Sequence, residues 1–241
     1  IWDPEVRGVS VFAATQIGKT LMLIGSILWC AENAPAPGMV VVPDRDAAIE
    51  LRDRIYAHAL ATVKRGRVSR ITVPPKRLWN TRYIDVGLLG VYLAWSGSQQ
   101  RLRGRPCRYV WLSEIDVYSK GKKKAGDPIA AAQQRTKAFF RSFHWHESSP
   151  SPEPSAIADL EAEASARFRW QCQCPKCGKW QELRFFPHAG GEYAGRGGIC
   201  GIKEESGEYL HAEDARAGAH YVCLNGCKIG NELKQRMLER G

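Results

Sequence analysis

The chain has 241 residues, 44% of them hydrophobic, which is enough to bury a full α/β core and to leave residues for a smaller second region. Its 35 Lys and Arg against 25 Asp and Glu give a formal net charge of +10, which favours a polyanionic partner, with nucleic acid as the leading candidate. Mildly basic composition is also common in proteins that bind no DNA. No apolar run reaches about 18 residues, so the sequence excludes a membrane-spanning helix.

An apolar strand predicted at residues 9–12 leads into Gly18, Lys19 and Thr20 and then into an apolar helix over 21–28. This order is typical of a Walker A phosphate-binding loop, in which backbone N–H groups of the turn and of the helix N-terminus point at phosphates. We expect Lys19 to reach the β- and γ-phosphate oxygens of a nucleotide and the Thr20 hydroxyl to hold Mg²⁺. The other residues of this turn are Thr15, Gln16 and Ile17. The alternative is an ordinary strand-turn-helix whose Lys faces solvent.

Alternating strands and helices follow this loop. Apolar runs at 40–43, 83–86 and 91–95 predict strands, and the pattern over 47–60 predicts a helix. The last two strands are predicted to form a hairpin because glycines lie between them. This order predicts a doubly wound α/β fold. The polar loop 96–105 then contains three arginines, namely Arg101, Arg103 and Arg105.

The segment 108–116 is an apolar strand that ends in two carboxylates, Glu114 and Asp116. A carboxylate at the carboxyl end of a strand can hold Mg²⁺ or orient an attacking water beside phosphates. The two residues point the same way if the strand continues through them. Acidic residues at strand ends are also common turn formers, but the upstream phosphate loop favours the functional interpretation.

A basic loop at 120–124, interpreted as a solvated turn, precedes a predicted helix over 129–139 and a predicted strand over 140–145. Polar residues follow this strand at 146–150, and we expect them beside the same sheet edge as the phosphate loop, where they can sense the γ-phosphate. A further helix is predicted over 156–166.

Six of the eight cysteines follow residue 170, and two pairs among them have metal-ligand spacing. We predict one structural Zn²⁺ site that closes this glycine-rich region and that indicates a reducing compartment. Free thiols are the alternative. The predicted ligands are Cys174, Cys177, Cys223 and Cys227, with Cys172 and Cys200 in reserve and with Cys30 and Cys107 predicted to be buried.

Taken in chain order, these motifs resemble the large terminase subunit of tailed bacteriophages, in particular the lambda-like family with a cysteine knuckle. The matching segments are Ala14-Thr-Gln-Ile-Gly-Lys-Thr20, the proline-ended strand 40–43, Leu102 to Asp116, Ser148-Ser-Pro150, Cys174-Pro-Lys-Cys-Gly178 and Tyr221-Val-Cys223. The resemblance implies an ATPase that threads double-stranded DNA into an empty capsid. It also implies a homo-oligomeric ring on the portal protein, assisted by a small terminase subunit, in the host cytoplasm and transiently on the procapsid.

The resemblance also implies residue roles. Lys19 and Thr20 would bind the phosphates of ATP and Mg²⁺, Glu114 would activate water, and Ser148 and Ser149 would couple hydrolysis to movement. Ser113 stands where the family's Walker B strand usually has Asp, so we expect Asp116 or an ordered water to compensate. Ala13 replaces the first Gly of the loop without removing a phosphate ligand. We further expect Arg101, Arg103 or Arg105 to act in trans as an arginine finger, with phosphate-backbone contact to DNA as the alternative.

The predicted organisation is a P-loop ATPase motor domain (RecA/ASCE-like) over 1–166, a zinc-binding subdomain over 167–230, and the start of a linker over 231–241. Because the chain opens on Ile1, we expect a fragment of a longer protein. The resemblance implies that a metal-dependent nuclease follows residue 241 in that protein. The alternatives are a helicase-like nucleic-acid translocase and a zinc-containing DNA-binding module with an inactive phosphate loop. Five acidic residues are interpreted as solvated surface and not as a nuclease site: Glu204, Glu205, Glu208, Glu213 and Asp214.

Overall fold

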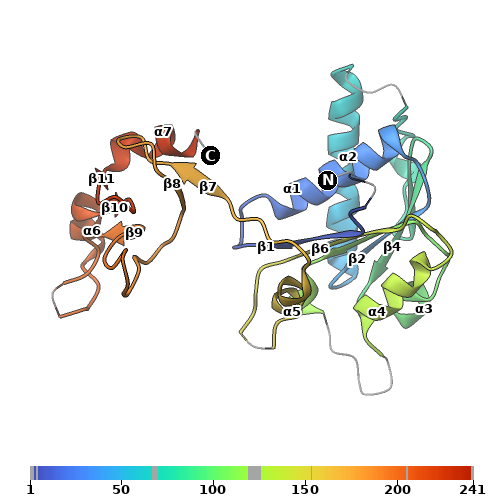
Figure 1. Ribbon diagram of the computed structural model, residues 1–241. Helices are drawn as coiled ribbons and strands as arrows, with labels where there is room; N and C mark the ends of the chain where they lie inside the picture. Colours follow the sequence, from blue (N-terminus) through green and yellow to red (C-terminus); the bar gives the residue numbers. More distant parts are fainter. Residues whose placement is uncertain are drawn as a thin grey trace. The chain divides into compact units, whose positions relative to one another are not determined.

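The computed structural model describes residues 3, 5–66, 70–118, 126–152, 154–204 and 206–239. The chain divides into two compact units, Ile1–Ser165 and Ala166–Gly241, which are called unit 1 and unit 2 below and are described separately (Figure 1). The predicted basic loop 120–124 and the acidic residue Glu205 lie outside the described residues.

Unit 1 contains a six-stranded sheet. Its strands are β1 (Gly8–Phe12), β2 (Gly38–Val42), β3 (Tyr83–Val86), β4 (Leu89–Trp95), β5 (Tyr109–Ser113) and β6 (Phe143–Ser148). They lie in the order β1-β6-β5-β2-β4-β3, and every neighbouring pair is parallel except β3 and β4, which form the predicted hairpin. Strands β2 and β5 are buried along their whole length because helices cover both faces of the sheet, and this explains their apolar sequences.

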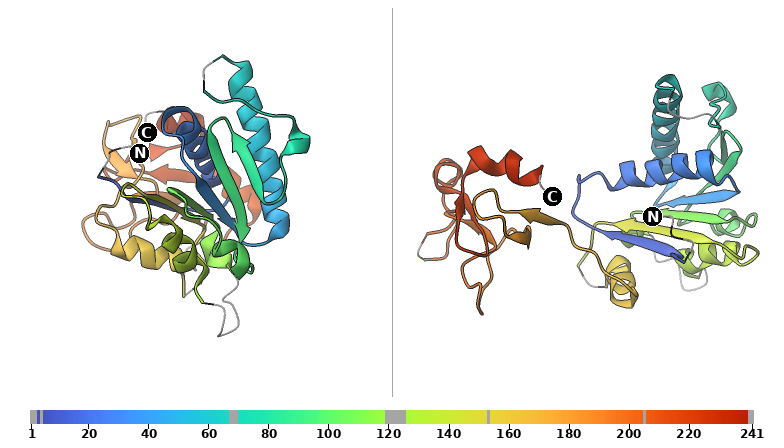
Figure 2. Two further views of the ribbon diagram at one scale, coloured as in Figure 1. Left: turned by 90° about the vertical axis from the view of Figure 1, so that its right-hand side faces the viewer. Right: turned by 45° about the horizontal axis from the view of Figure 1, so that its top comes forward.

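Helices cover both faces of this sheet (Figures 1 and 2). One face packs against α1 (Lys19–Asn33) and α2 (Arg45–Lys64), and the other packs against α3 (Gln99–Leu102), α4 (Pro128–Gln133) and α5 (Ala156–Glu163). Short 3₁₀ turns are η1 (Lys76–Leu78), η2 (Ile115–Val117) and η3 (Gln134–Thr136). The predicted α/β fold, a mostly parallel sheet flanked by helices, is confirmed.

Side-chain caps define where several of these helices begin. The Asp44 carboxylate accepts the backbone N–H of Ala47 at 2.9 Å at the start of α2. Asp127 caps α4 in the same way, and Ser155 caps α5. Each cap satisfies an N–H group that has no partner inside the helix.

Alternation along β5 divides the core of unit 1 into two layers. Tyr109 and Trp111 face α1 and α2, and the Trp111 indole N–H donates to the Ser26 hydroxyl of α1 at 2.8 Å in a buried hydrogen bond. Val110 and Leu112 point to the opposite face, toward α3, α4 and α5. Ser113, the next residue in the alternation, therefore lies on the α1 face.

Three predicted boundaries differ from the structure. The strand expected over 140–145 is β6, which begins at Phe143 and continues through three buried polar residues to Ser148. The helix expected over 129–139 ends as α4 at Gln133 and continues only as the 3₁₀ turn η3. The helix α5 ends at Glu163, three residues earlier than expected.

Unit 2 consists of two small sheets and short helices. Its elements are β7 (Gln171–Gln173), β8 (Trp180–Glu182), β9 (Gly198–Cys200), α6 (Ala212–Gly218), β10 (His220–Val222), β11 (Lys228–Ile229), η4 (Asn231–Leu233) and α7 (Lys234–Leu238). Strands β7 and β8 pair with each other, and the second sheet has the order β11-β10-β9, antiparallel throughout. Strand β9 lies in the glycine-rich region between the two cysteine pairs. Residues 231–238, expected as the start of a linker, are helical, and Met237 is buried with Ile229.

Among the described helices, none combines the length and the apolar character that crossing a lipid bilayer requires.

The close contact between Gly38 and Trp111 yields a stability prediction. A Cβ atom added at Gly38 would overlap the Trp111 ring, which is fixed by its hydrogen bond to Ser26. Gly38→Ala should therefore lower the free energy of unfolding by about 1–3 kcal/mol.

Gly25 provides the matched control, because it lies in α1 with open space around an added Cβ. Gly25→Ala should raise the free energy of unfolding by about 0.5–1 kcal/mol through helix propensity. Urea denaturation of both variants measures these changes, and equal shifts in the two variants would contradict the packing argument.

Candidate functional site

The turn between β1 and α1 brings a helix N-terminus to the carboxyl edge of the sheet. Gly18 adopts φ 92° at the N-cap of α1, a left-handed conformation that glycine adopts without strain, and Gln16 adopts φ 60°. The predicted loop residues Thr15, Gln16 and Ile17 are exposed, so their backbone is open to a ligand. Free N–H groups at a helix N-terminus favour a bound anion.

Lys19 is the first residue of α1, and its side chain is directed inward. Only 5% of the residue is exposed. Its ammonium donates to the Ala14 carbonyl at 2.9 Å and to the Ser149 hydroxyl at 2.8 Å, and lies 3.8 Å from Glu114 Oε1. The alternative of a solvent-facing lysine is therefore wrong. The next residue, Thr20, is half-buried.

Glu114 follows β5 directly and leaves the strand in a left-handed conformation, with φ 55°. The Ser149 backbone N–H donates to Glu114 Oε2 at 3.4 Å, while the Ser149 hydroxyl accepts from Lys19. Ser149 therefore joins the lysine of the loop to the carboxylate of β5. Strained backbone of this kind at a non-glycine residue is frequent at functional sites.

Ser148 ties the end of β6 to both of its neighbours. The Ala13 N–H donates to the Ser148 carbonyl at 3.4 Å, and the Asp116 N–H donates to the Ser148 hydroxyl at 3.2 Å. The structure thus brings Lys19, Glu114, Ser148 and Ser149 together at one edge of the sheet.

Asp116 lies in a different environment from Glu114. The two carboxylates were expected to point the same way if the strand continued through them, but β5 ends at Ser113 and η2 begins at Ile115, so this condition is not met. Asp116 accepts hydrogen bonds from the backbone N–H groups of Ser151 and Ile157 and from two serine hydroxyls, those of Ser151 and Ser155. Partial burial opposes ionisation, but these donors hold the pKa of Asp116 below its ordinary value.

Sequence reasoning missed a further carboxylate, Glu147. It is fully buried on β6, directly across from Ser113, whose hydroxyl donates to Glu147 Oε1 at 2.6 Å. Burial raises the pKa of Glu147, as does the nearby Glu114, while the Ser113 hydroxyl and Lys19 oppose the rise. The signal in the sequence was an acidic residue shortly after a run of apolar and aromatic residues. We interpreted this acidic residue as part of the polar segment that follows the strand.

The three arginines of segment 96–105 differ in their surroundings. Arg101 donates to the carbonyls of Thr81 and Leu93, and its guanidinium lies 4.0 Å from the centre of the Trp95 ring. Burial lowers the pKa of Arg101. Arg103 and Arg105 are exposed.

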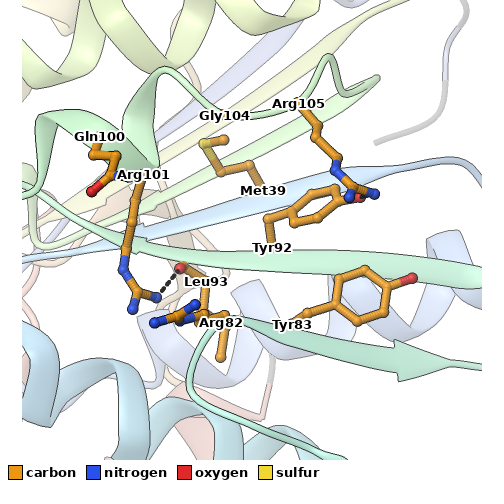
Figure 3. Close-up of a pocket in the computed structure, with 9 residues that line it drawn as sticks. All are labelled: Met39, Arg82, Tyr83, Tyr92, Leu93, Gln100, Arg101, Gly104 and Arg105. Atoms are coloured by element: carbon orange, nitrogen blue, oxygen red, sulfur yellow. Dashed lines mark hydrogen bonds between the residues drawn. The ribbon is translucent and has the colours of Figure 1, made fainter.

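Arg101 and Arg105 also border a surface cavity of about 800 Å³ (Figure 3). The Arg105 guanidinium donates to the Tyr92 hydroxyl at 3.2 Å in this cavity. Two more of the lining residues are Arg82 and Tyr83, so the cavity is basic and aromatic. None of its lining residues belongs to the phosphate loop.

The four predicted metal ligands of unit 2 lie together. The sulfur atoms of Cys174, Cys177, Cys223 and Cys227 are all within 4.8 Å of one another, and these cysteines form no disulfide. Cys177 Sγ and Cys223 Sγ are 3.8 Å apart. Tetrahedral Zn²⁺ with Zn–S bonds of about 2.3 Å separates its sulfur ligands by about 3.8 Å, so the donor set fits this metal. A backbone N–H at Lys179 lowers the pKa of Cys177 to about 7.

The reserve cysteines lie outside this cluster. Cys172 is buried and its sulfur accepts the indole N–H of Trp170 at 3.1 Å. Cys200 is half-buried on β9. Cys30 and Cys107 are buried in unit 1, as predicted.

A helix N-terminus with an inward lysine, beside a carboxylate that follows a parallel strand, is typical of α/β nucleotide hydrolases. A family comparison agrees with this class. The chain belongs to the phage terminase large subunit gpA family, ATPase domain, whose model matches residues 1–241. The resemblance predicted from the sequence is confirmed, and membership of this family implies that ATP is the nucleotide.

Two solved structures of phage terminases are similar to this chain, and the first of them shares its fold. The large terminase of bacteriophage HK97 is 13% identical over 68% of this chain and 34% of that chain, with a TM-score of 0.52. The large terminase ATPase domain of Thermus phage P74-26 is 16% identical over 73% of this chain and 71% of that chain, with a TM-score of 0.48. This chain therefore spans about a third of the HK97 protein. No functionally curated protein matches it.

Proposed function

We propose that this chain is the ATPase motor of a terminase large subunit, which hydrolyses ATP to translocate double-stranded DNA into a procapsid. The observation that carries the proposal is the convergence of Lys19, Ser149 and Glu114 at the carboxyl edge of a parallel sheet. The net charge of +10 is consistent with DNA as the partner.

In this proposal, the exposed turn and the N-terminus of α1 bind the ATP phosphates through backbone N–H groups. Lys19 compensates charge on the β- and γ-phosphates, and the Thr20 hydroxyl holds Mg²⁺. When bound, Mg²⁺ neutralises charge that develops on the phosphate oxygens. Oxygen donors at this edge suit that ion. Glu114 orients the attacking water and accepts its proton.

In this proposal, Ser148 and Ser149 couple ATP hydrolysis to movement. Ser149 contacts both Lys19 and Glu114, so a phosphate that draws Lys19 away also removes one partner of Ser149. Ser148 contacts the backbone at Ala13 and Asp116, which follow the two neighbouring strands. A shift at the phosphate loop therefore reaches β6. Asp116 has a positioning role, because its carboxylate holds the start of α5.

The motor is proposed to act as a homo-oligomeric ring with the portal protein and a small terminase subunit. Residues 1–166 form the motor domain, and residues 167–230 form a subdomain closed by Zn²⁺. Arg103 is the proposed arginine finger, because it is exposed. Arg101 is directed at backbone carbonyls of its own chain, and the exposed Arg105 donates to the Tyr92 hydroxyl.

Lys19 and Glu114 should affect ATP hydrolysis differently. Lys19→Ala should weaken ATP binding at least tenfold, because it removes the positive charge on the phosphates. Glu114→Gln should change ATP affinity less than threefold and lower turnover about 10²- to 10⁴-fold, because the water loses its base. Binding of a fluorescent ATP analogue and DNA-stimulated phosphate release measure the two effects.

Matched controls are Lys137→Ala and Glu163→Gln, which change exposed residues of unit 1. Both should behave like the unaltered protein. Equal loss of ATP affinity in the Lys19 and Glu114 variants would contradict the assigned roles. Absence of any phosphate release, with DNA bound, would favour the DNA-binding module over an ATPase.

The arginine assignment predicts that Arg103→Ala lowers DNA-stimulated turnover about 10³-fold or more without changing the melting temperature. Arg101→Ala should instead lower the free energy of unfolding by about 1–3 kcal/mol, because it loses two hydrogen bonds and the contact with Trp95. Mixing Arg103→Ala subunits with Glu114→Gln subunits should restore part of the activity. No restoration in rings shown to be mixed would indicate a DNA contact at Arg103.

The cysteine cluster predicts one Zn²⁺ per chain when the protein is prepared without chelator. Cys174→Ser should lower the zinc content severalfold and destabilise unit 2, while the melting of unit 1 is retained. Cys200→Ser is the control, because Cys200 lies outside the cluster, and it should keep the metal. Elemental analysis and two-transition thermal melting test this; full zinc content in Cys174→Ser would rule out the proposed ligand set.

A further inference from the structure

The resemblance to terminases predicts an acidic residue at the end of β5, where this chain has Ser113. Ser113 is the last residue of this strand, and its side chain lies on the face of the sheet that is covered by α1. The proposed phosphate loop leads into α1, and Thr20 lies in the first turn of that helix. A serine hydroxyl is a neutral and weak ligand, whereas Mg²⁺ in nucleotide sites is held by carboxylates, waters and phosphates. A carboxylate on a neighbouring strand can supply the charge that Ser113 lacks.

Glu147 is such a carboxylate. It lies on β6, the strand between β1 and β5, in register with Val11 on one side and Ser113 on the other. Parallel neighbours in register point to the same face, so Glu147 also faces α1. Trp145, two residues earlier on β6, belongs to the core layer that includes α1, which agrees with this direction.

The Glu147 side chain is only partly satisfied by the protein. Oε1 accepts the Ser113 hydroxyl at 2.6 Å. Oε2 is buried and has no hydrogen-bond partner among the described residues. The whole residue has no exposed surface. A buried carboxylate oxygen without a donor or cation is unfavourable, and such a group in a native protein indicates a ligand or a catalytic role.

Among the residues that the structure describes, two other carboxylates lie at this edge, and both are already engaged. Asp116 accepts four hydrogen bonds, from Ser151, Ser155 and Ile157, which hold the start of α5. Glu114 lies beyond the strand end, is 38% exposed in its side chain and contacts Lys19. Its position suits a water-orienting residue. Of the described carboxylates at this edge, Glu147 is the one that has an oxygen free for a cation.

We propose that Glu147 is the acidic ligand of the nucleotide-bound Mg²⁺, directly or through a water, and that Ser113 holds the Glu147 side chain by hydrogen bonding. The missing acidic residue of β5 is thereby replaced from the adjacent strand. This inference rests on the proposed ATPase function. It assigns the metal role to Glu147 and not to Asp116.

The test is the Mg²⁺ dependence of nucleotide binding at equilibrium, measured with a fluorescent ATP analogue in the full chain. Glu147→Gln keeps the size of the side chain and an acceptor for the Ser113 hydroxyl. In EDTA, the affinity of this variant for the analogue should stay within twofold of that of the unaltered protein. The Mg²⁺ concentration at which the enhancement of analogue binding is half-maximal should rise at least tenfold. Asp159→Asn is the control, since it removes an exposed acidic charge of α5, and its midpoint should not move.

A second variant exchanges the two residues: Ser113→Asp with Glu147→Ser returns one carboxylate to β5. Its Mg²⁺ midpoint should lie within threefold of the unaltered protein, and this variant decides the test if Glu147→Gln does not melt cooperatively. An unchanged midpoint in folded Glu147→Gln, or a tenfold rise in the exchanged variant, overturns the proposal. So does a rise in Asp116→Asn with none in Glu147→Gln. Unaltered protein that binds no analogue, with or without Mg²⁺, overturns the ATPase function itself and this inference with it.

Discussion

The placement of β6 between β1 and β5 determines the geometry of the carboxyl edge. Its parallel pairing puts Ser148 beside Phe12 and Glu147 beside Ser113, so that the chain leaves β6 at Ser149 between the phosphate loop and Glu114. A slip of one residue would reverse every side chain of the strand and turn Glu147 toward α5. Buried Trp145 opposes such a slip, because its large ring must remain in the layer against α1. Core packing two residues away therefore fixes the register on which the site depends.

Much of the fold could be predicted from the sequence, because the parallel strands are apolar runs separated by helical patterns. The secondary structure after residue 128 was harder to predict. Three polar residues end β6 in full burial, and a sequence pattern cannot distinguish a polar loop from polar side chains that find partners across a sheet. The early end of β5 was also not predictable, since it depends on the left-handed conformation of Glu114.

The parts of the site that could be predicted are those encoded in short sequence motifs, and the parts that were missed depend on contacts between distant segments. Lys19 and the cysteine pairs belong to short motifs that indicate phosphate binding and metal binding. The structure places both pairs of cysteines in one cluster. The partners of Lys19 were less accessible: Ser149 lies 130 residues away, and the contact follows from strand order. Glu147 was missed for the same reason, because its neighbour Ser113 is on another strand. Arg101 and Arg103 differ because only Arg101 lies close to backbone carbonyls of neighbouring strands. A sequence pattern cannot predict such contacts.

The inward position of Lys19 has a consequence for nucleotide exchange. Its ammonium donates hydrogen bonds to the Ala14 carbonyl and the Ser149 hydroxyl. In the proposed ATPase, a nucleotide phosphate therefore exchanges these partners of Lys19 for its own oxygens. Affinity is reduced by the strength of those bonds. In the proposed cycle, the same two oxygens can accept the ammonium again when phosphate leaves, so Lys19 is never left as an unpaired buried charge.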